Sequence, residues 1–327
     1  ERDWLGPLHE MAALAMDLRR LRMARGSIDF DLPEAQIVLD LTGAAESIVR
    51  SPRTLAHQII EEFMLRANEA AATRMFWRKA PFVYRIHEAP DGEQLEAFSE
   101  FIAAFGLQLP GGGRRPADFQ ELLERVKGRP EERSVNKVLL RTMKQARYAA
   151  HAAEHFGLAS ERYTHFTSPI RRYPDLVVHR LVRRTLLGEK QIRVPEDLEA
   201  VAEACSRLER ASMAAEREIV DYHKCRFMED KVGDTFKGHI AGVTAFGVFV
   251  ELEEYFVEGL VHLSTLADDY YHYDERRHSL QGERTKRLFR IGDPLTVRLA
   301  AVGLAQRRLD FELADGPKRP AERKTRR

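Results

Sequence analysis

The hydrophobic pattern of the chain changes at Lys231, and this change constrains the fold more than any other feature. Before Lys231, apolar residues recur at the helical spacing of three and four; after it, short alternating runs are separated by turn residues. Five runs are expected to be strands: Val232–Ile240, Phe246–Leu252, Gly259–Leu263, Leu295–Val302 and Leu309–Leu313. Five short strands are typical of a small Greek-key barrel. The sequence therefore predicts an α+β chain, with helices packed on mixed strands in residues 1–230 and a barrel in residues 231–315.

Two helical patterns near the N-terminus are strong. Residues 4–24 and 52–77 both read as amphipathic helices, and Gly26 is expected to end the first. The apolar side chains expected to face inward are Leu5, Leu8, Met11, Ala12, Ala15, Leu18 and Leu21 in the first helix, and Ile59, Ile60, Phe63, Met64 and Ala67 in the second.

Other segments of the first part are expected to alternate between strand and helix. Residues 27–41 look extended, with Pro33 marking a break or an edge, and residues 82–87 alternate like a strand. The pattern then predicts helices over 169–187 and over about 195–229.

Composition limits the class of protein. The 327 residues suggest two or three domains, and a content of 44% hydrophobic and 31% charged residues is ordinary for a globular chain. The net charge is only +1, so affinity for nucleic acid has to come from local patches. Cys205 and Cys225 show no pairing logic and are expected to be reduced thiols of a cytoplasmic protein. No apolar stretch reaches the roughly 18 residues of a membrane span, so we expect no membrane partner.

The first residues give a further expectation. Residues 1–5 do not resemble a signal peptide and include no initiator Met. We therefore expect the natural N-terminus to lie elsewhere.

Residues 163–175 concentrate chemistry that suits a phosphate. A Thr-Ser pair can cap a helix that starts at Pro169, and the free N–H groups of a first helical turn favour an anion. Arg171 and Arg172 add two guanidinium groups to the same turn. An alternative is a capped surface helix with an Arg171–Asp175 ion pair. The residues alone leave both interpretations open.

Several motifs, taken in order, resemble one family. Residues 165–176 read His-Phe-Thr-Ser-Pro-Ile-Arg-Arg-Tyr-Pro-Asp-Leu, which resembles the signature of the ribonuclease II/ribonuclease R (RNB) family of processive 3′→5′ exoribonucleases. Residues 26–34, 56–68 and 155–158 match further motifs, and residues 233–313 resemble the family's terminal segment. The resemblance covers nearly the whole chain.

The resemblance implies a fold and an activity. It implies the C-terminal part of an RNB catalytic domain in residues 1–230 and an S1 domain, a five-stranded OB-fold barrel, in residues 231–315. The intact enzyme is then expected to hydrolyse single-stranded RNA to nucleoside 5′-monophosphates with Mg²⁺. The family's Asp cluster, D-x5-D-x-D-D, does not occur in this chain, and the spacing of Asp29, Asp31 and Glu34 does not match it. The metal ligands are therefore expected in a missing N-terminal part, a possible partner of this otherwise monomeric protein.

The resemblance also implies roles for particular residues. Arg171 matches the arginine that contacts the scissile phosphate, and Phe30 matches an aromatic residue that stacks on the 3′-terminal base. Glu61 matches a glutamate that senses ribose hydroxyls, and Glu216 matches a carboxylate near the 3′ end, expected to be catalytic. Further RNA-binding candidates are Tyr163, Thr167, Ser168, Arg172 and His179. Without the resemblance, Phe30 reads as a core aromatic and the two glutamates as surface residues.

The predicted barrel carries its own candidate site. Phe246, Phe249 and His262 match the RNA-binding face of S1 domains. Strand alternation alone puts the two phenylalanines on opposite faces unless Gly247 bulges the strand. An exposed aromatic beside His262 would stack on bases. Residues 316–327 contain six Lys or Arg and one Glu, and are expected to be disordered and either to contact RNA or only to aid solubility.

Other functions are considered. Residues 151–155 fit the H-x-x-E-H pattern of inverted zinc proteases, but such short patterns arise often in Ala-rich segments. His57 and Glu61, four residues apart on one helix face, could bind a metal, but a hydrogen bond within the helix is the commoner explanation. Because the metal cluster is absent, a non-catalytic RNA-binding or adaptor module is the main alternative. A phosphorolytic nuclease with an S1 domain is another.

Overall fold

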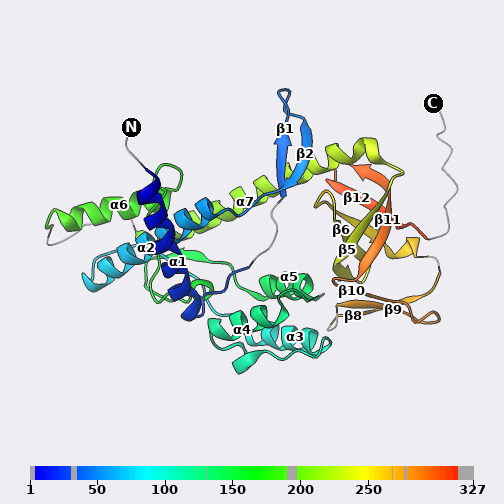
Figure 1. The fold of residues 1–327 in the computed structure, drawn as a ribbon, viewed down its shortest axis with the longest axis horizontal. Helices are drawn as coiled ribbons and strands as arrows, with labels where there is room; N and C mark the ends of the chain where they lie inside the picture. The colour runs from blue at the N-terminus through cyan, green and yellow to red at the C-terminus, as the bar shows by residue number, and fades with distance from the viewer. Residues whose placement is uncertain are drawn as a thin grey trace. The chain divides into compact units, whose positions relative to one another are not determined.

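The computed structural model describes residues 4–30, 35–129, 131–189, 197–266, 268–275 and 278–315. They form helices and strands that divide into two compact units (Figure 1). The first unit comprises residues 1–32 and 52–215, and the second comprises residues 33–51 and 216–327. The α+β prediction is confirmed. The division differs from the predicted boundary at residue 230, because an early hairpin and the end of a long helix belong to the second unit.

The first unit is mainly helical. Its elements are α1 (Leu5–Ala24), α2 (Leu55–Trp77), α3 (Gly92–Ala103), α4 (Pro116–Val126), α5 (Glu132–Thr142), α6 (Tyr173–Leu186) and the antiparallel pair β3 (Tyr84–Ile86) and β4 (Arg147–Ala149). The long helix α7 (Leu198–Met228) begins in this unit. A buried cluster joins α2, both strands, α6 and α7 through side chains that include Met75, Ile86, Tyr148, Val178 and Ala202. The signature segment lies between β4 and α6 in the chain, next to this core.

The bounds predicted for α2 are nearly correct, but its predicted inner face is wrong. Ile60 is 63% exposed, and Ile59, Phe63, Met64 and Ala67 are only partly buried. The buried residues are Glu62, Leu65, Asn68, Glu69, Ala72 and Met75. The helix turns a partly polar face inward because arginines of α1 and a loop of the core supply partners for its carboxylates and amide.

α1 also buries less of its apolar stripe than predicted. Ala15 and Arg22 are its buried residues, whereas Leu5 and Leu21 are about two-thirds exposed. Gly26 ends the helix as expected: its φ is +99°, and an added Cβ would lie 2.8 Å from Ala117.

The second unit contains the predicted barrel. Its closed strand order is β11-β12-β7-β6-β5, and all neighbours are antiparallel except β12 and β7. The strands are β5 (Thr235–Thr244), β6 (Gly247–Leu252), β7 (Glu258–His262), β11 (Pro294–Gly303) and β12 (Arg308–Leu313). The five predicted strands are therefore confirmed, although β5 begins and ends three to four residues later than expected. Fully buried Val248, Val250, Val261, Val297 and Leu299 contribute to the interior.

Sequence reasoning missed further strands of this unit. A three-stranded antiparallel sheet, β10-β9-β8, is formed by β8 (Tyr271–Asp274), β9 (Ser279–Gly282) and β10 (Leu288–Arg290). In the described residues of the segment expected to be extended over 27–41, the strand is β1 (Ala35–Leu39), which pairs with β2 (Ala45–Arg50). Strands of three to six residues carry too few alternations to stand out from loops.

Some expectations fall outside the described residues or concern single features. Pro33, Asp31, Glu34 and the basic segment 316–327 lie outside the described part of the chain. No helix within the described ranges is long and apolar enough to cross a bilayer. Cys205 and Cys225 both lie on α7 as free thiols, and burial raises the pKa of Cys225 to about 11.

Candidate functional site

A buried amide holds the signature loop, residues 163–172, against α2. Asn68 is fully buried; its Nδ2 donates to the Tyr163 hydroxyl at 2.9 Å, and its Oδ1 accepts from the Phe166 N–H at 2.9 Å. Because both ends of the amide are engaged, the loop is fixed to the helix at two points. Asn68 lies in a motif noted in the sequence, but only the fold reveals this role.

Two predicted RNA contacts support the loop from within. Tyr163 is 3% exposed, its hydroxyl is bonded to Asn68, and burial raises its pKa. His179 Nε2 donates to the Phe166 carbonyl at 2.8 Å, and its ring stacks on Phe166 with a centroid separation of 4.1 Å. A side chain buried like Tyr163 offers no face to a ligand, so the geometry gives it a supporting position.

The helix after the signature begins later than predicted. α6 starts at Tyr173 rather than at Pro169, and the intervening residues form a turn. The N–H groups of Arg171 and Arg172 donate to the Ser168 carbonyl at 3.3 and 3.1 Å. The predicted helix start is therefore wrong, and these amides are not free to bind an anion.

The carboxylate of Asp175 explains this turn. Asp175 is fully buried, and its Oδ1 accepts from the Ser168 N–H and from Arg172 Nη2, both at 2.8 Å. The partner of Asp175 is therefore Arg172, not Arg171 as in the alternative interpretation of the sequence. Three buried polar atoms beside these bonds, Asp175 Oδ2, Arg172 Nε and Thr167 Oγ1, find no partner among the described residues.

The two signature arginines consequently have different positions. Arg172 is engaged with Asp175, whereas Arg171 is exposed and no described residue pairs with its guanidinium. Arg171 lies between Ile170, which is 97% exposed, and Tyr173, which is 47% exposed. A free guanidinium on a turn held by a buried carboxylate is suited to bidentate contact with a phosphate.

His165, in the signature loop, is uncharged. Tyr148 Oη lies 2.8 Å from His165 Nδ1, and the Arg85 guanidinium lies over the Tyr148 ring. Burial, together with the nearby charges of Arg172 and Arg85, lowers the pKa of His165 to about 2. The positive charge of this site therefore comes from arginine.

A second cluster places Glu61 beside the segment that carries Phe30. Arg53 Nη2 donates to both oxygens of Glu61 at 3.0 and 2.8 Å, and its Nη1 donates to Asp29 at 3.2 and 3.3 Å. Arg19 also pairs with Asp29. Burial alone would lower the pKa of Arg53, but the bonds to Glu61 and the charge of Asp29 raise it. Phe30 follows Asp29 in the chain and is half-buried.

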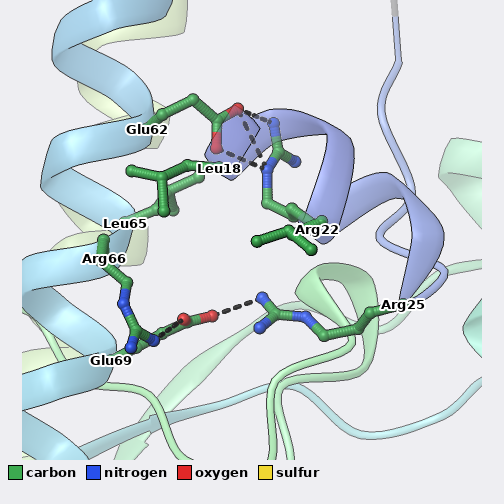
Figure 2. Close-up of a pocket in the computed structure, with 8 residues that line it drawn as sticks. Leu18, Arg22, Arg25, Glu62, Leu65, Arg66 and Glu69 are labelled. Carbon is green, nitrogen blue, oxygen red and sulfur yellow. Dashed lines mark hydrogen bonds and ion pairs between the residues drawn. The ribbon is translucent and has the colours of Figure 1, made fainter. Parts of the chain in front are cut away.

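A buried ion pair anchors this cluster between α1 and α2. Arg22 is 6% and Glu62 2% exposed, and the guanidinium donates to Glu62 through Nε at 3.1 and 3.2 Å and through Nη2 at 2.6 Å (Figure 2). Arg22 Nη2 also donates to Glu61 at 3.3 Å. Burial alone would lower the pKa of Arg22, but the surrounding carboxylates raise it. Sequence reasoning missed Arg22, Arg53 and Glu62; the available signal was a pair of adjacent glutamates in an apolar helical window.

The S1 candidates lie together on the outer surface of the barrel. Phe249 and His262 fall on the same face of β6 and β7, because Phe249 pairs with Leu260 and Gly247 with His262. Phe246 is 49% exposed in the turn before β6, and its ring centroid is 6.0 Å from that of Phe249. Glycine at position 247, with φ +154°, lets the backbone of β6 lie close to β7, since an added Cβ would lie 2.3 Å from the Val261 carbonyl oxygen.

The remaining candidates have no shared site. Glu216 is exposed on α7 and is the first α7 residue of the second unit. His57 Nδ1 accepts from the Thr54 N–H at the start of α2, so its hydrogen bond is with the helix cap and not with Glu61. His151 and His155 do not lie on a helix, which removes the geometry of the H-x-x-E-H pattern.

The described residues do not fit the metal that the family resemblance implies. No group of three or more His, Cys, Asp or Glu side chains within the described ranges could hold a metal ion. The carboxylates of the Glu61 cluster are instead bonded to arginines, whose charges would repel a cation. These residues are therefore not ligands of a metal ion.

Comparison with known families gives two matches. The family described as "RNB domain" matches residues 3–188, and the family described as "S1 RNA binding domain" matches residues 229–313.

Individual relatives agree with these matches. Ribonuclease R of Aquifex aeolicus is 45% identical over 317 residues, which cover 94% of this chain and 44% of that relative. Ribonuclease R of Escherichia coli K12 is 40% identical over 325 residues, which cover 96% of this chain and 40% of that relative. Mycoplasma genitalium RNase R in complex with ribose methylated single-stranded RNA superposes with a TM-score of 0.89 at 29% identity, covering 94% of this chain and 49% of that one. The chain thus spans less than half the length of the curated relatives it matches.

Proposed function

Because the chain belongs to the RNB family and contains an S1 RNA binding domain, we propose that it is the part of a 3′→5′ exoribonuclease that holds the 3′ end of RNA. The observation that carries this proposal is the free Arg171 guanidinium on a turn fixed by buried Asp175. The intact protein hydrolyses single-stranded RNA and releases nucleoside 5′-monophosphates. We also propose that the intact protein is a monomer and acts in the cytoplasm.

Each residue of the first unit has a proposed task. Arg171 contacts the scissile phosphate and stabilises the charge that develops on it. Phe30 stacks on the terminal base, and Glu61 accepts a hydrogen bond from a ribose hydroxyl, which distinguishes RNA from DNA. Arg172, Ser168 and His179 hold the loop that presents Arg171, and Thr167 remains a candidate for contact with RNA. Glu216 is a further catalytic candidate.

RNB nucleases are metal-dependent in general, and we propose Mg²⁺ as the ion. When bound, it would activate water and stabilise the phosphate's charge. Its ligands would come from outside the described residues, from the N-terminal half of the intact enzyme.

A degradation assay tests the proposed activity. The full-length protein that carries this chain is incubated with uniformly labelled poly(A), with Mg²⁺ or with EDTA, and with or without inorganic phosphate. We expect progressive shortening from the 3′ end and nucleoside 5′-monophosphates with Mg²⁺ only. RNA binding without degradation under both conditions would favour the adaptor function, and a requirement for phosphate would favour a phosphorolytic enzyme.

The barrel face predicts a dependence on RNA length. Phe249→Ala removes a ring from the outer surface of β6, where stacking contributes about 1–3 kcal/mol per base. We expect the variant to lose about tenfold or more in affinity for long RNA, and much less for oligomers too short to reach the S1 domain. Fluorescence anisotropy with both RNAs measures this, and Val250→Ala, a change in the barrel interior, is the matched control for destabilisation of the barrel. Equal losses on both RNAs would show that Phe249 acts only in packing.

A further inference from the structure

Arg53 connects the two residues next to the proposed 3′-terminal subsite. It lies just before α2, and its guanidinium bonds both to Glu61 on that helix and to Asp29, which precedes Phe30. One nitrogen donates to both oxygens of Glu61, and the other donates to both oxygens of Asp29. Only a planar fork with several fixed donors can hold two carboxylates in this way.

Asp29 transmits this link to Phe30. Its carboxylate is held by Arg53 and Arg19, and its neighbour Ile28 donates its N–H to the Gly157 carbonyl at 2.9 Å. The backbone that leads to Phe30 is therefore fixed by the core at Ile28 and by Arg53, together with Arg19, at Asp29. Displacing Arg53 would loosen both Phe30 and Glu61.

Glu61 keeps acceptor capacity for a ligand. Its side chain is 29% exposed, and its hydrogen bonds among the described residues come from Arg53 and from Arg22, which contacts Oε1. A carboxylate offers about four acceptor positions. One position on Oε2 therefore remains open to a hydroxyl donor, in an orientation that Arg53 sets.

We propose that Arg53 is a positioning residue for sugar specificity: it holds the Glu61 carboxylate where a ribose hydroxyl donates to it, and keeps Phe30 in register with that contact. The inference rests on the proposed role of Glu61. A site built to bond a substrate hydroxyl rejects analogues that lack it, provided that the bonding group is held rigidly. Loosening Glu61 therefore lowers the rate on the ribo substrate more than the rate on the deoxy substrate, so the discrimination between the two falls.

The test compares two substrates in the full-length protein. One is an oligoribonucleotide, and the other is the same oligomer with 2′-deoxynucleotides at its 3′ end. The variants are Arg53→Gln, which removes the charge, and Arg53→Lys, which keeps the charge but not the fork. Glu61→Ala tests the premise. The matched control is Arg20→Gln, at an exposed arginine of α1 whose partner among the described residues is Asp17, one turn away. The readouts are kcat/KM on both substrates and the melting temperature.

We expect both Arg53 variants to lower the ratio of kcat/KM for the ribo over the deoxy substrate by about tenfold or more, and the control to leave it unchanged. A merely structural role would reduce both rates together and leave the ratio intact; that result, with Glu61→Ala still lowering the ratio, overturns the inference and leaves the role of Glu61 standing. An unchanged ratio in Glu61→Ala overturns the premise and the inference together. If Arg53→Gln fails to fold, Arg53→Lys decides alone.

Discussion

Replacing Arg171 with alanine in the full-length protein is expected to lower kcat by about 10²–10³-fold, while the affinity for long RNA changes by only a few-fold. The reason is the difference between the two signature arginines. Arg172 is tied to buried Asp175, so the turn persists without Arg171, whose guanidinium has no partner among the described residues. Its loss removes charge stabilisation at one phosphate, whereas binding is spread over many contacts along the strand.

Single-turnover degradation and filter binding, on the same RNA, measure the two effects. Arg183→Ala is the matched control, because Arg183 is an exposed arginine at the other end of α6. We expect that variant to behave like the parent protein. A kcat comparable to the parent's for Arg171→Ala would refute the proposed contact with the scissile phosphate.

Glu62→Ala is expected to destabilise the first unit by about 3–5 kcal/mol, the usual cost of leaving one charge of a buried pair uncompensated. Arg22 is only 6% exposed, so in this variant its guanidinium would stay buried without its main partner. The effect is expected in α1 and α2, which this pair joins. Hydrogen–deuterium exchange of peptides from the two helices measures it locally, because an unfolding curve of a chain with two units need not be two-state.

Two controls sharpen this prediction. Glu121→Gln breaks an exposed pair with Arg125 on α4, where both side chains are about half exposed, and should change stability by less than about 1 kcal/mol. The double substitution Arg22→Met with Glu62→Leu should regain most of the lost stability, since an apolar pair can replace a buried ion pair. Exchange in Glu62→Ala that matches the parent protein would mean that the pair does not hold α1 to α2.

The barrel was predicted more fully than the first unit. Its strands carry buried valines at alternate positions, such as Val248 and Val250, and this period is visible without any tertiary information. In α2, by contrast, helical periodicity was read correctly but the inner face was not. Burial of Glu62 and Asn68 depends on Arg22 and on the loop at Phe166, both distant in sequence.

The candidate site shows the same division. The motif located the loop, and the family resemblance implied that Arg171 contacts the phosphate, but the residues alone did not show why Arg171, rather than Arg172, has a free guanidinium. That distinction follows from Asp175, whose carboxylate selects Arg172 and moves the helix start to Tyr173. Capping rules consider only local residues, and here a buried carboxylate in the first turn of α6 outweighs the Thr-Ser-Pro cap.

Local periodicity and motif order were thus enough to establish the α+β class, the five barrel strands and the RNB and S1 resemblance, because each depends on residues close together in the chain. Which charges are buried and how Arg53 joins Asp29 to Glu61 were decided only when distant segments met. Burying a charge is favourable only beside a specific partner, and the identity of that partner is a property of the tertiary structure.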